Sequence, residues 1–203
     1  MSPPDVGPRL QTPRLLLRPP GPADLPATCA MNADPEVMRF FPAPMRPDEV
    51  ELMLGRIDAH FARCGFGFWA VERRDNAAVI GLIGLVEVTF ALPGRPCPPP
   101  AGARPPVEVG WRLVSSAWGQ GFAREGATAA LRFAFEGIAL PEVLSFTVPA
   151  NTRSWGLMER LGLRRDPAGG FEHPRLPVGH PLRPHLLYGI DRAGWSSAQG
   201  SAR

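Results

Sequence analysis

The chain has 203 residues, of which 44% are hydrophobic, and its formal net charge at neutral pH is +3. This length suits one compact domain. All 22 basic residues are arginine, but the excess of positive charge is too small to indicate nucleic-acid binding by itself. The three cysteines have no CxxC spacing, which favours free thiols in a reducing compartment over disulfides or a zinc site.

Neither a secretion signal nor a membrane span is expected. The first residues, MSPPDVGPRLQTPR, lack the basic and then apolar pattern of a signal peptide. The longest apolar run, AAVIGLIGLV at 77–86, is about half the length of a membrane span. We therefore expect a cytoplasmic protein with no membrane partner. Its expected parts are a flexible N-terminus at 1–9, a single domain at 10–190 and a disordered tail at 191–203.

The first half of the chain predicts a mixture of helices and strands. The segment 46–65 gives the clearest helix, because Val50, Leu54, Ile57 and Phe61 repeat with the helical period and Gly65 follows them. The segment 91–106 carries seven prolines and predicts no regular structure. A second helix is expected at 22–33, and strands are expected at 13–19, 66–74, 77–90 and 107–114.

The second half alternates strands and helices. From Gly121 onward, apolar residues follow the helical period to about Glu136. A helix is expected at 151–162, with Asn151 as its N-cap and Gly162 at its end. Strands are expected at 143–148 and 185–190. This order of elements indicates a mixed α/β sheet.

The segment WGQGFAREGATAA, residues 118–130, places a glycine-rich turn between a strand and a helix. Such a turn presents free N–H groups at the positive end of a helix, which suits a phosphate. The dinucleotide pattern GxGxxG fails because Arg124 occupies its third glycine position. The P-loop pattern fails because Ala127 stands where its lysine is required. Gly119 and Gly121 could also simply form a tight turn.

A third pattern fits this segment. VEVGWRLVSSAWGQGFAREGATAALRFAF resembles the pyrophosphate loop of the GNAT superfamily of N-acetyltransferases. With TPRLLLRP before it and NTRSWGLMERLGL after it, the order resembles the branch of Rim-type ribosomal-protein alanine N-acetyltransferases, over about residues 10–190. The resemblance implies the GNAT fold, an α/β fold. Its mixed, mostly antiparallel sheet is splayed between two central parallel strands and has helices on both faces.

The resemblance also implies acetyl-CoA as co-substrate and requires no metal. Acetyl-CoA would enter between the strands at 107–114 and 143–148, where the backbone N–H groups of Leu113 and Val114 would hold the pantetheine and polarise the acetyl carbonyl. Asn151 could contact the pantetheine or act only as an N-cap. The expected pyrophosphate donors are the N–H groups of Gln120, Gly121, Phe122 and Ala123, and Arg124 could add positive charge.

The proton donor for the departing thiolate is less clear from the resemblance. Many superfamily members carry a tyrosine seven residues after an asparagine, but counting seven from Asn151 gives Met158, which cannot donate a proton. Ser154 stands where the alanine acetyltransferase branch also carries serine, and it is the first candidate, with helix capping as the alternative. Tyr188, the single tyrosine of the chain, is the second candidate.

Glu108 is the first candidate for the general base. It lies in an apolar strand, and burial raises the pKa of a carboxyl group toward the range useful for taking a proton. It could equally face outward or pair with an arginine. Glu87, Glu172 and His173 are the further candidates.

The acceptor stays open between protein N-termini, a polyamine-like molecule, and an amino-acid or drug amine. A homodimer is also left open, and no aromatic and basic surface points to nucleic acid. The alternative function is a catalytically silent CoA-binding sensor or partner module, because the usual tyrosine is missing.

Overall fold

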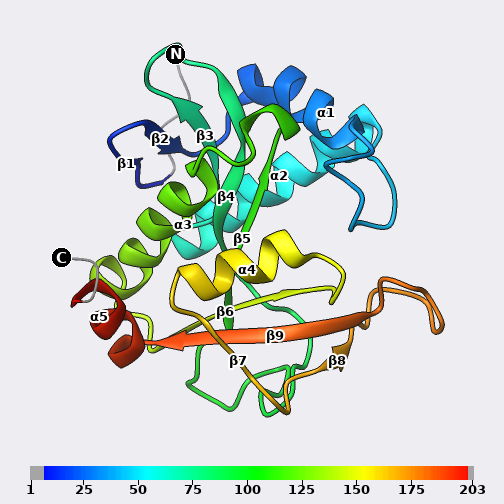
Figure 1. Cartoon of the computed structure of the whole chain (residues 1–203), viewed down its shortest axis with the longest axis vertical. Helices are drawn as coiled ribbons and strands as arrows, with labels where there is room; N and C mark the ends of the chain where they lie inside the picture. The colour runs from blue at the N-terminus through cyan, green and yellow to red at the C-terminus, as the bar shows by residue number, and fades with distance from the viewer. Residues whose placement is uncertain (1–6, 201–203) are drawn as a thin grey trace. The chain divides into compact units, whose positions relative to one another are not determined.

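The computed structural model of the protein describes residues 7–200. The chain forms two compact units, which are described separately: unit 1 comprises residues 1–86 and 110–130, and unit 2 comprises residues 87–109 and 131–203. Figure 1 shows strand β5 (Val107–Leu113) and helix α3 (Phe122–Arg132). Each of them begins in one unit and ends in the other. The expected fold class is confirmed: the fold is mixed α/β, and the strands are mostly antiparallel with one parallel pair.

The strands of unit 1 pair with their neighbours in chain order. They are β1 (Leu10–Gln11), β2 (Leu15–Arg18), β3 (Phe68–Arg73) and β4 (Val79–Glu87), whose last residue already counts with unit 2. The end of β5 joins β4, since the N–H of Val114 donates to the carbonyl of Ile80 at 2.9 Å. Gly81 allows the two strands to approach closely, because a Cβ there would lie 2.2 Å from the carbonyl oxygen of Arg112.

The helices of unit 1 follow the predicted pattern. A 3₁₀ turn (Pro22–Asp24) leads into α1 (Leu25–Ala33), and α2 spans Pro47–Cys64. Helix α2 buries Val50, Ile57 and Phe61, and Gly65 ends it in the left-handed region with φ of +75°. The ring of Phe61 packs edge-to-face on the fully buried Trp69, with 5.6 Å between centroids. The spacing in the sequence therefore predicts the buried face of α2, except that Leu54 is only partly buried.

Unit 2 is organised around β9 (Pro184–Asp191). This strand pairs antiparallel with β6 (Glu142–Thr147), β7 (Arg164–Arg165) and β8 (Phe171–Glu172). The start of β5 runs parallel to β6, with Glu108 opposite Leu144. Helix α4 (Thr152–Arg160) contacts β6 and β7, and α3 continues into a wider π-helical turn at Phe133–Gly137 (Figure 1).

The prediction of a disordered tail is wrong for residues 192–200, the part of the tail beyond β9 that the structure describes. Arg192–Gly200 form helix α5. Trp195 is 3% exposed, stacks on Phe135 at 5.7 Å between centroids and donates its indole N–H to Glu136 at 3.3 Å. Burial of this one large aromatic side chain explains why a short helix forms here. Residues 1–6 of the expected flexible N-terminus and the last residues, 201–203, lie outside the described part.

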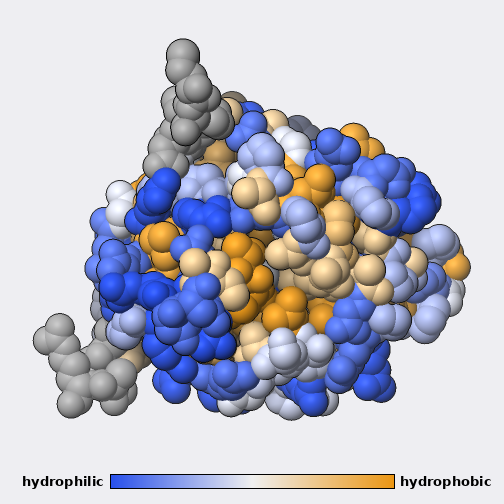
Figure 2. Space-filling view, turned by 90° about the horizontal axis from the view of Figure 1, so that it is seen from above, coloured by the Kyte–Doolittle hydropathy of each residue, from blue (hydrophilic) through white to orange (hydrophobic). Residues whose placement is uncertain are grey.

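Within residues 7–200, no helix combines the length and the apolar character that crossing a bilayer requires. Hydrophobic side chains do reach the surface, as Figure 2 shows for one face. Among the large ones in the described part, Phe41 is 37% exposed, Leu52 61% and Val178 88%.

Candidate active site

A loop with two left-handed glycines connects β5 to α3. After a 3₁₀ turn at Ser115–Ala117, Gly119 has φ of +72° and Gly121 has φ of +82°, a region that side chains disfavour. The first N–H that bonds within α3 belongs to Glu125, which donates to the carbonyl of Gly121 at 3.0 Å. The preceding N–H groups, of Phe122, Ala123 and Arg124, therefore lie at the free positive end of the helix. This arrangement suits an anion such as a pyrophosphate.

Arg14 lies against this loop, although local sequence pattern does not reveal a role for it. Its Nη1 donates to the carbonyl of Gln120 at 2.9 Å, and its guanidinium stacks on the ring of Phe122 at 4.5 Å from the centroid. Its Nε donates to Glu125 at 2.6 Å, and its side chain is 48% exposed. The positive charge of Arg14 is thus held next to Gly121. The side chain of Arg124, which the sequence suggested for this role, is exposed. The sequence signal that could have indicated Arg14 is the motif TPRLLLRP, to which it belongs.

Glu125 holds Arg14 in place. It accepts hydrogen bonds from the Thr12 hydroxyl at 2.6 Å and from the backbone N–H of Arg14 at 2.9 Å. Burial raises the pKa of Glu125, but the hydrogen bonds from Thr12 and Arg14 outweigh it and lower the pKa below its usual value. The first turn of α3 is therefore anchored to the segment before β2.

The structure corrects one expected cofactor contact. The N–H of Val114 already donates to Ile80, so it is not available for the pantetheine or the acetyl carbonyl. Successive N–H groups of a strand point to opposite edges, so the N–H of Leu113 points away from β4 and stays a candidate. The carbonyl of Leu113 accepts the indole N–H of Trp118 at 2.9 Å, which fixes the start of the loop.

Glu108, in unit 2, is partly exposed and has no hydrogen-bond partner among the described side chains. Burial raises its pKa to about 8, while the positive charge of Arg175 opposes this shift. Arg175 itself donates to the hydroxyl of Thr89 at 2.6 Å. A raised pKa agrees with the sequence-based expectation, and the role of Glu108 as a base stays a prediction.

Asn151 is the N-cap of α4, as predicted. Its Oδ1 accepts the N–H of Ser154 at 3.3 Å, and its Nδ2 donates to the Thr147 hydroxyl at 3.1 Å. The capping group is therefore Asn151, and the half-buried hydroxyl of Ser154 makes no hydrogen bond within the described part of the chain. The hydroxyl is free for the proposed role at the thiolate.

Tyr188 is 2% exposed, and its hydroxyl donates to Glu159 of α4 at 3.2 Å. Burial and the negative charge of Glu159 raise the pKa of Tyr188 above its usual value, against a smaller effect of Arg165. Glu159 lies five residues beyond Ser154 on α4, or about 7.5 Å along the helix axis. The hydroxyl of Tyr188 is thus bound to Glu159, whereas that of Ser154 has no partner among the described residues.

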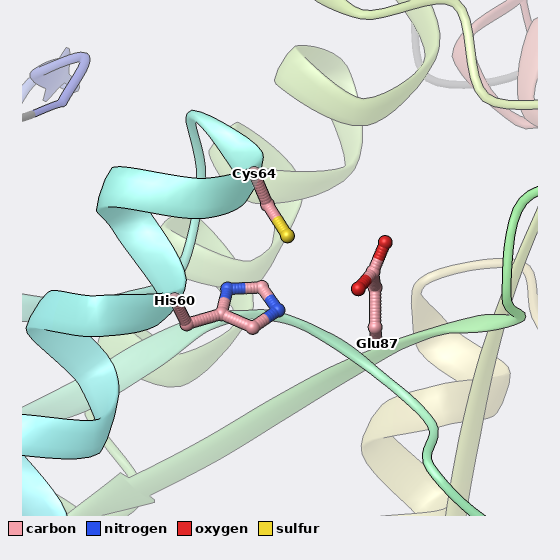
Figure 3. A group of neighbouring side chains, drawn as sticks. All are labelled: His60, Cys64 and Glu87. Atoms are coloured by element: carbon pink, nitrogen blue, oxygen red, sulfur yellow. The ribbon is translucent and has the colours of Figure 1, made fainter.

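The remaining candidate bases occupy different surroundings. Glu172 is exposed and pairs with Arg183 at 3.0 Å. His173 packs 4.9 Å from both Phe90 and His185 between ring centroids, and burial, with the nearby charges of His185 and Arg175, lowers its pKa to about 4. Figure 3 shows Glu87, the last residue of β4, together with His60 and Cys64 of α2.

The chain is similar to known proteins in sequence and in structure. Residues 14–164 match the family model described as Acetyltransferase (GNAT) domain. The chain is 32% identical over 201 residues to FsC-acetyl coenzyme A-N(2)-transacetylase of Aspergillus fumigatus, covering 95% of this chain and 80% of that protein. It is also similar to the crystal structure of an acetyltransferase from Agrobacterium tumefaciens, with a TM-score of 0.70, 28% identity, and coverage of 90% and 94% of the two chains.

A spermidine N-acetyltransferase from Vibrio cholerae, solved in complex with CoA and spermine, has a TM-score of 0.68 and covers 91% of this chain and 99% of its own. Its identity of 19% supports a common fold only.

Proposed function

The chain belongs to the GNAT acetyltransferase family and is an acetyl-CoA-dependent acyltransferase, and we propose that it acetylates a primary amine by direct attack in a ternary complex. The observation that carries the proposal is the loop at 119–124, where left-handed glycines, the start of α3 and Arg14 together suit a pyrophosphate. In this proposal, the free N–H groups of the loop bind the pyrophosphate and the N–H of Leu113 contacts the pantetheine or the acetyl carbonyl.

The proposed chemistry needs two proton transfers. The amine nitrogen attacks the thioester carbonyl, the C–N bond forms and the C–S bond breaks. Glu108 takes the proton that the amine loses, directly or through water. Ser154 hydrogen-bonds the CoA sulfur, directly or through water, and relays a proton from solvent to the departing thiolate, so that its own hydroxyl is left unchanged. Asn151 positions Ser154 by capping α4. Tyr188 is the alternative donor, although its hydroxyl is bound to Glu159.

We extend the proposal to the domain organisation, the acceptor and the location of the protein. We propose that residues 10–190 act as one acetyltransferase domain, because the matched segment draws on both units. The order of the motifs supports membership of the Rim-type branch. We propose that the acceptor amine belongs to a protein N-terminus or to a small molecule. We propose the cytoplasm as the location, because the spacing of the three cysteines favours free thiols in a reducing compartment.

Calorimetric titration with acetyl-CoA tests the proposed loop. In Gly121→Val, the side chain would impose strain at φ of +82°, and its Cβ would lie 3.3 Å from Nη2 of Arg14, so we expect binding to weaken at least tenfold. Gly21→Val is the matched control, because Gly21 has φ of −123° and nothing lies within 4 Å of its added Cβ. Equal affinity of wild type and Gly121→Val would refute the binding mode.

Release of CoA with a panel of primary amines tests transfer. Turnover with at least one amine is expected. Binding of acetyl-CoA without CoA release from any amine would instead support the silent CoA-binding module.

A further inference from the structure

Arg112, on β5 directly before Leu113, has an unusual environment in unit 1. Its Nη1 donates to Oδ1 of Asn32 and lies 3.9 Å from Sδ of Met45. Its guanidinium lies 3.8 Å from the centroid of the Phe41 ring. The Nε is buried and has no hydrogen-bond partner among the residues that the structure describes. A strong donor of this side chain is therefore left unused.

No acidic side chain in the described part of the chain compensates the charge of Arg112. Burial alone lowers the pKa of Arg112 to about 10, so the guanidinium still carries its charge at neutral pH. Asp34 accepts instead from the hydroxyl of Ser115 at 3.1 Å. Arg112 is partly exposed as a residue, but a charge that is largely withdrawn from water without an acidic partner still destabilises the folded protein. By contrast, Arg18 of the same unit is bound by Asp24 through two hydrogen bonds of 2.8 Å.

The groups around Arg112 differ in how far they are exposed. Asn32 is fully buried and is fixed by a hydrogen bond of 2.7 Å from its Nδ2 to the carbonyl of Thr28. Phe41 is 37% exposed and begins the exposed segment 41–44. The guanidinium thus lies between a buried amide and an aromatic ring at the surface, and Arg112 itself is partly exposed.

We propose that Arg112 binds a carboxylate of the acceptor, so that the protein selects amines that also carry a carboxylate group. This inference rests on the proposed amine acetylation. A carboxylate matches the planar guanidinium, and its hydrogen bond to Nε would both use the free donor and supply the missing counter-charge. Arg112 adjoins Leu113, the proposed cofactor contact, so the acceptor would be held beside the cofactor strand. A polyamine, which carries only positive charge, would be disfavoured.

The test compares Arg112→Met, which keeps a long apolar stem but removes the charge, with Arg39→Met. Arg39 is a suitable control because it is exposed and its guanidinium also stacks on a phenylalanine, Phe40, at 5.5 Å. The substrates are ω-amino acids of three to six carbons and their carboxamides, assayed by CoA release. We expect wild type and Arg39→Met to prefer the carboxylates at least tenfold in kcat/KM, and Arg112→Met to lose this preference. An unchanged preference in Arg112→Met would overturn the proposal.

A binding measurement separates this proposal from acetyl transfer itself. Calorimetry in the presence of CoA follows 6-acetamidohexanoate and its carboxamide, neither of which requires turnover. The carboxylate should bind at least tenfold more tightly than the carboxamide to wild type, and equally weakly to Arg112→Met. Absence of this difference in wild type overturns the proposal, whether or not CoA is released from any amine.

Thermal unfolding distinguishes recognition from a packing role. Arg112→Met removes a charge that has no acidic partner, but it also takes the donor from the buried Oδ1 of Asn32, so the two effects oppose each other and we expect only a small change in Tm. A lower Tm together with an unchanged carboxylate preference would assign Arg112 to packing. Arg112→Lys, which keeps the charge but lacks the planar fork, should keep part of the preference, and a complete loss would contradict the charge-based argument.

Discussion

Replacing Glu108 by glutamine should remove a pH dependence of folding stability. In the folded protein, burial raises the pKa of Glu108 from 4.5 to about 8. The folded state therefore holds this proton more tightly than the unfolded state does. The resulting contribution to stability is fully present below about pH 4, and it is lost as the pH rises through 8.

The pKa values set the size of the effect. At about 1.4 kcal/mol for each pKa unit, a rise from 4.5 to about 8 corresponds to a loss on the order of 5 kcal/mol in the free energy of unfolding. The side chain is partly exposed, so solvent reduces the loss, and we expect about 2–4 kcal/mol between pH 5 and pH 9.

Urea unfolding at several pH values from 5 to 9 measures this loss. The stability of wild type should fall relative to that of Glu108→Gln as the pH rises. Glu51→Gln, which changes an exposed glutamate of α2, is the control and should follow wild type. Parallel curves for wild type and Glu108→Gln would refute the argument that burial holds the proton on Glu108.

The same variant tests the proposed base. If Glu108 takes the proton of the amine, kcat/KM of wild type should rise with pH and level off above about 8, where the carboxylate forms. Glu108→Gln should lose this limb and most of the rate, with acetyl-CoA affinity unchanged. A wild-type rate profile in the variant would move the search to Glu87, Glu172 and His173, in that order.

Two further substitutions test the proton donor and the C-terminal helix. Ser154→Ala should lower turnover by ~10²-fold with little change in CoA affinity, when turnover is measured under conditions where chemistry is rate-limiting. Unaltered turnover would make Tyr188 the next candidate for the proton donor. Trp195→Ala should lower the free energy of unfolding by about 3–5 kcal/mol, because Trp195 is 3% exposed and stacks on Phe135. A loss below about 1 kcal/mol in urea unfolding would show that α5 does not depend on this contact.

The sequence predicts those features that depend on neighbouring residues. The period of Val50, Ile57 and Phe61 identifies the buried face of α2, and Gly65 identifies its end. Asn151 is recognisable as an N-cap because the cap bond reaches only three residues ahead. The glycine spacing at 119–121 similarly predicts the turn before α3.

Features that depend on distant residues could not be read in the same way. Arg14 meets Gln120 across more than a hundred positions, and Trp195 stacks on Phe135, so neither contact follows from local pattern. The two-residue strands β1, β7 and β8 are too short to show an alternation of apolar residues. The N–H of Val114 is not available to a cofactor because it donates to the carbonyl of Ile80 when β5 pairs with β4. The sequence of β5 alone does not specify this pairing.

The position of β9 late in the chain has a consequence for synthesis on the ribosome. β6, β7 and β8 all pair with β9, yet each is made before it. From Thr147 at the end of β6 to Asp191 at the end of β9 are 191 − 147 = 44 residues, which take about 2–9 s to translate. During that interval β6 presents an unpaired edge, so the nascent chain is most exposed to aggregation and proteolysis just before β9 emerges.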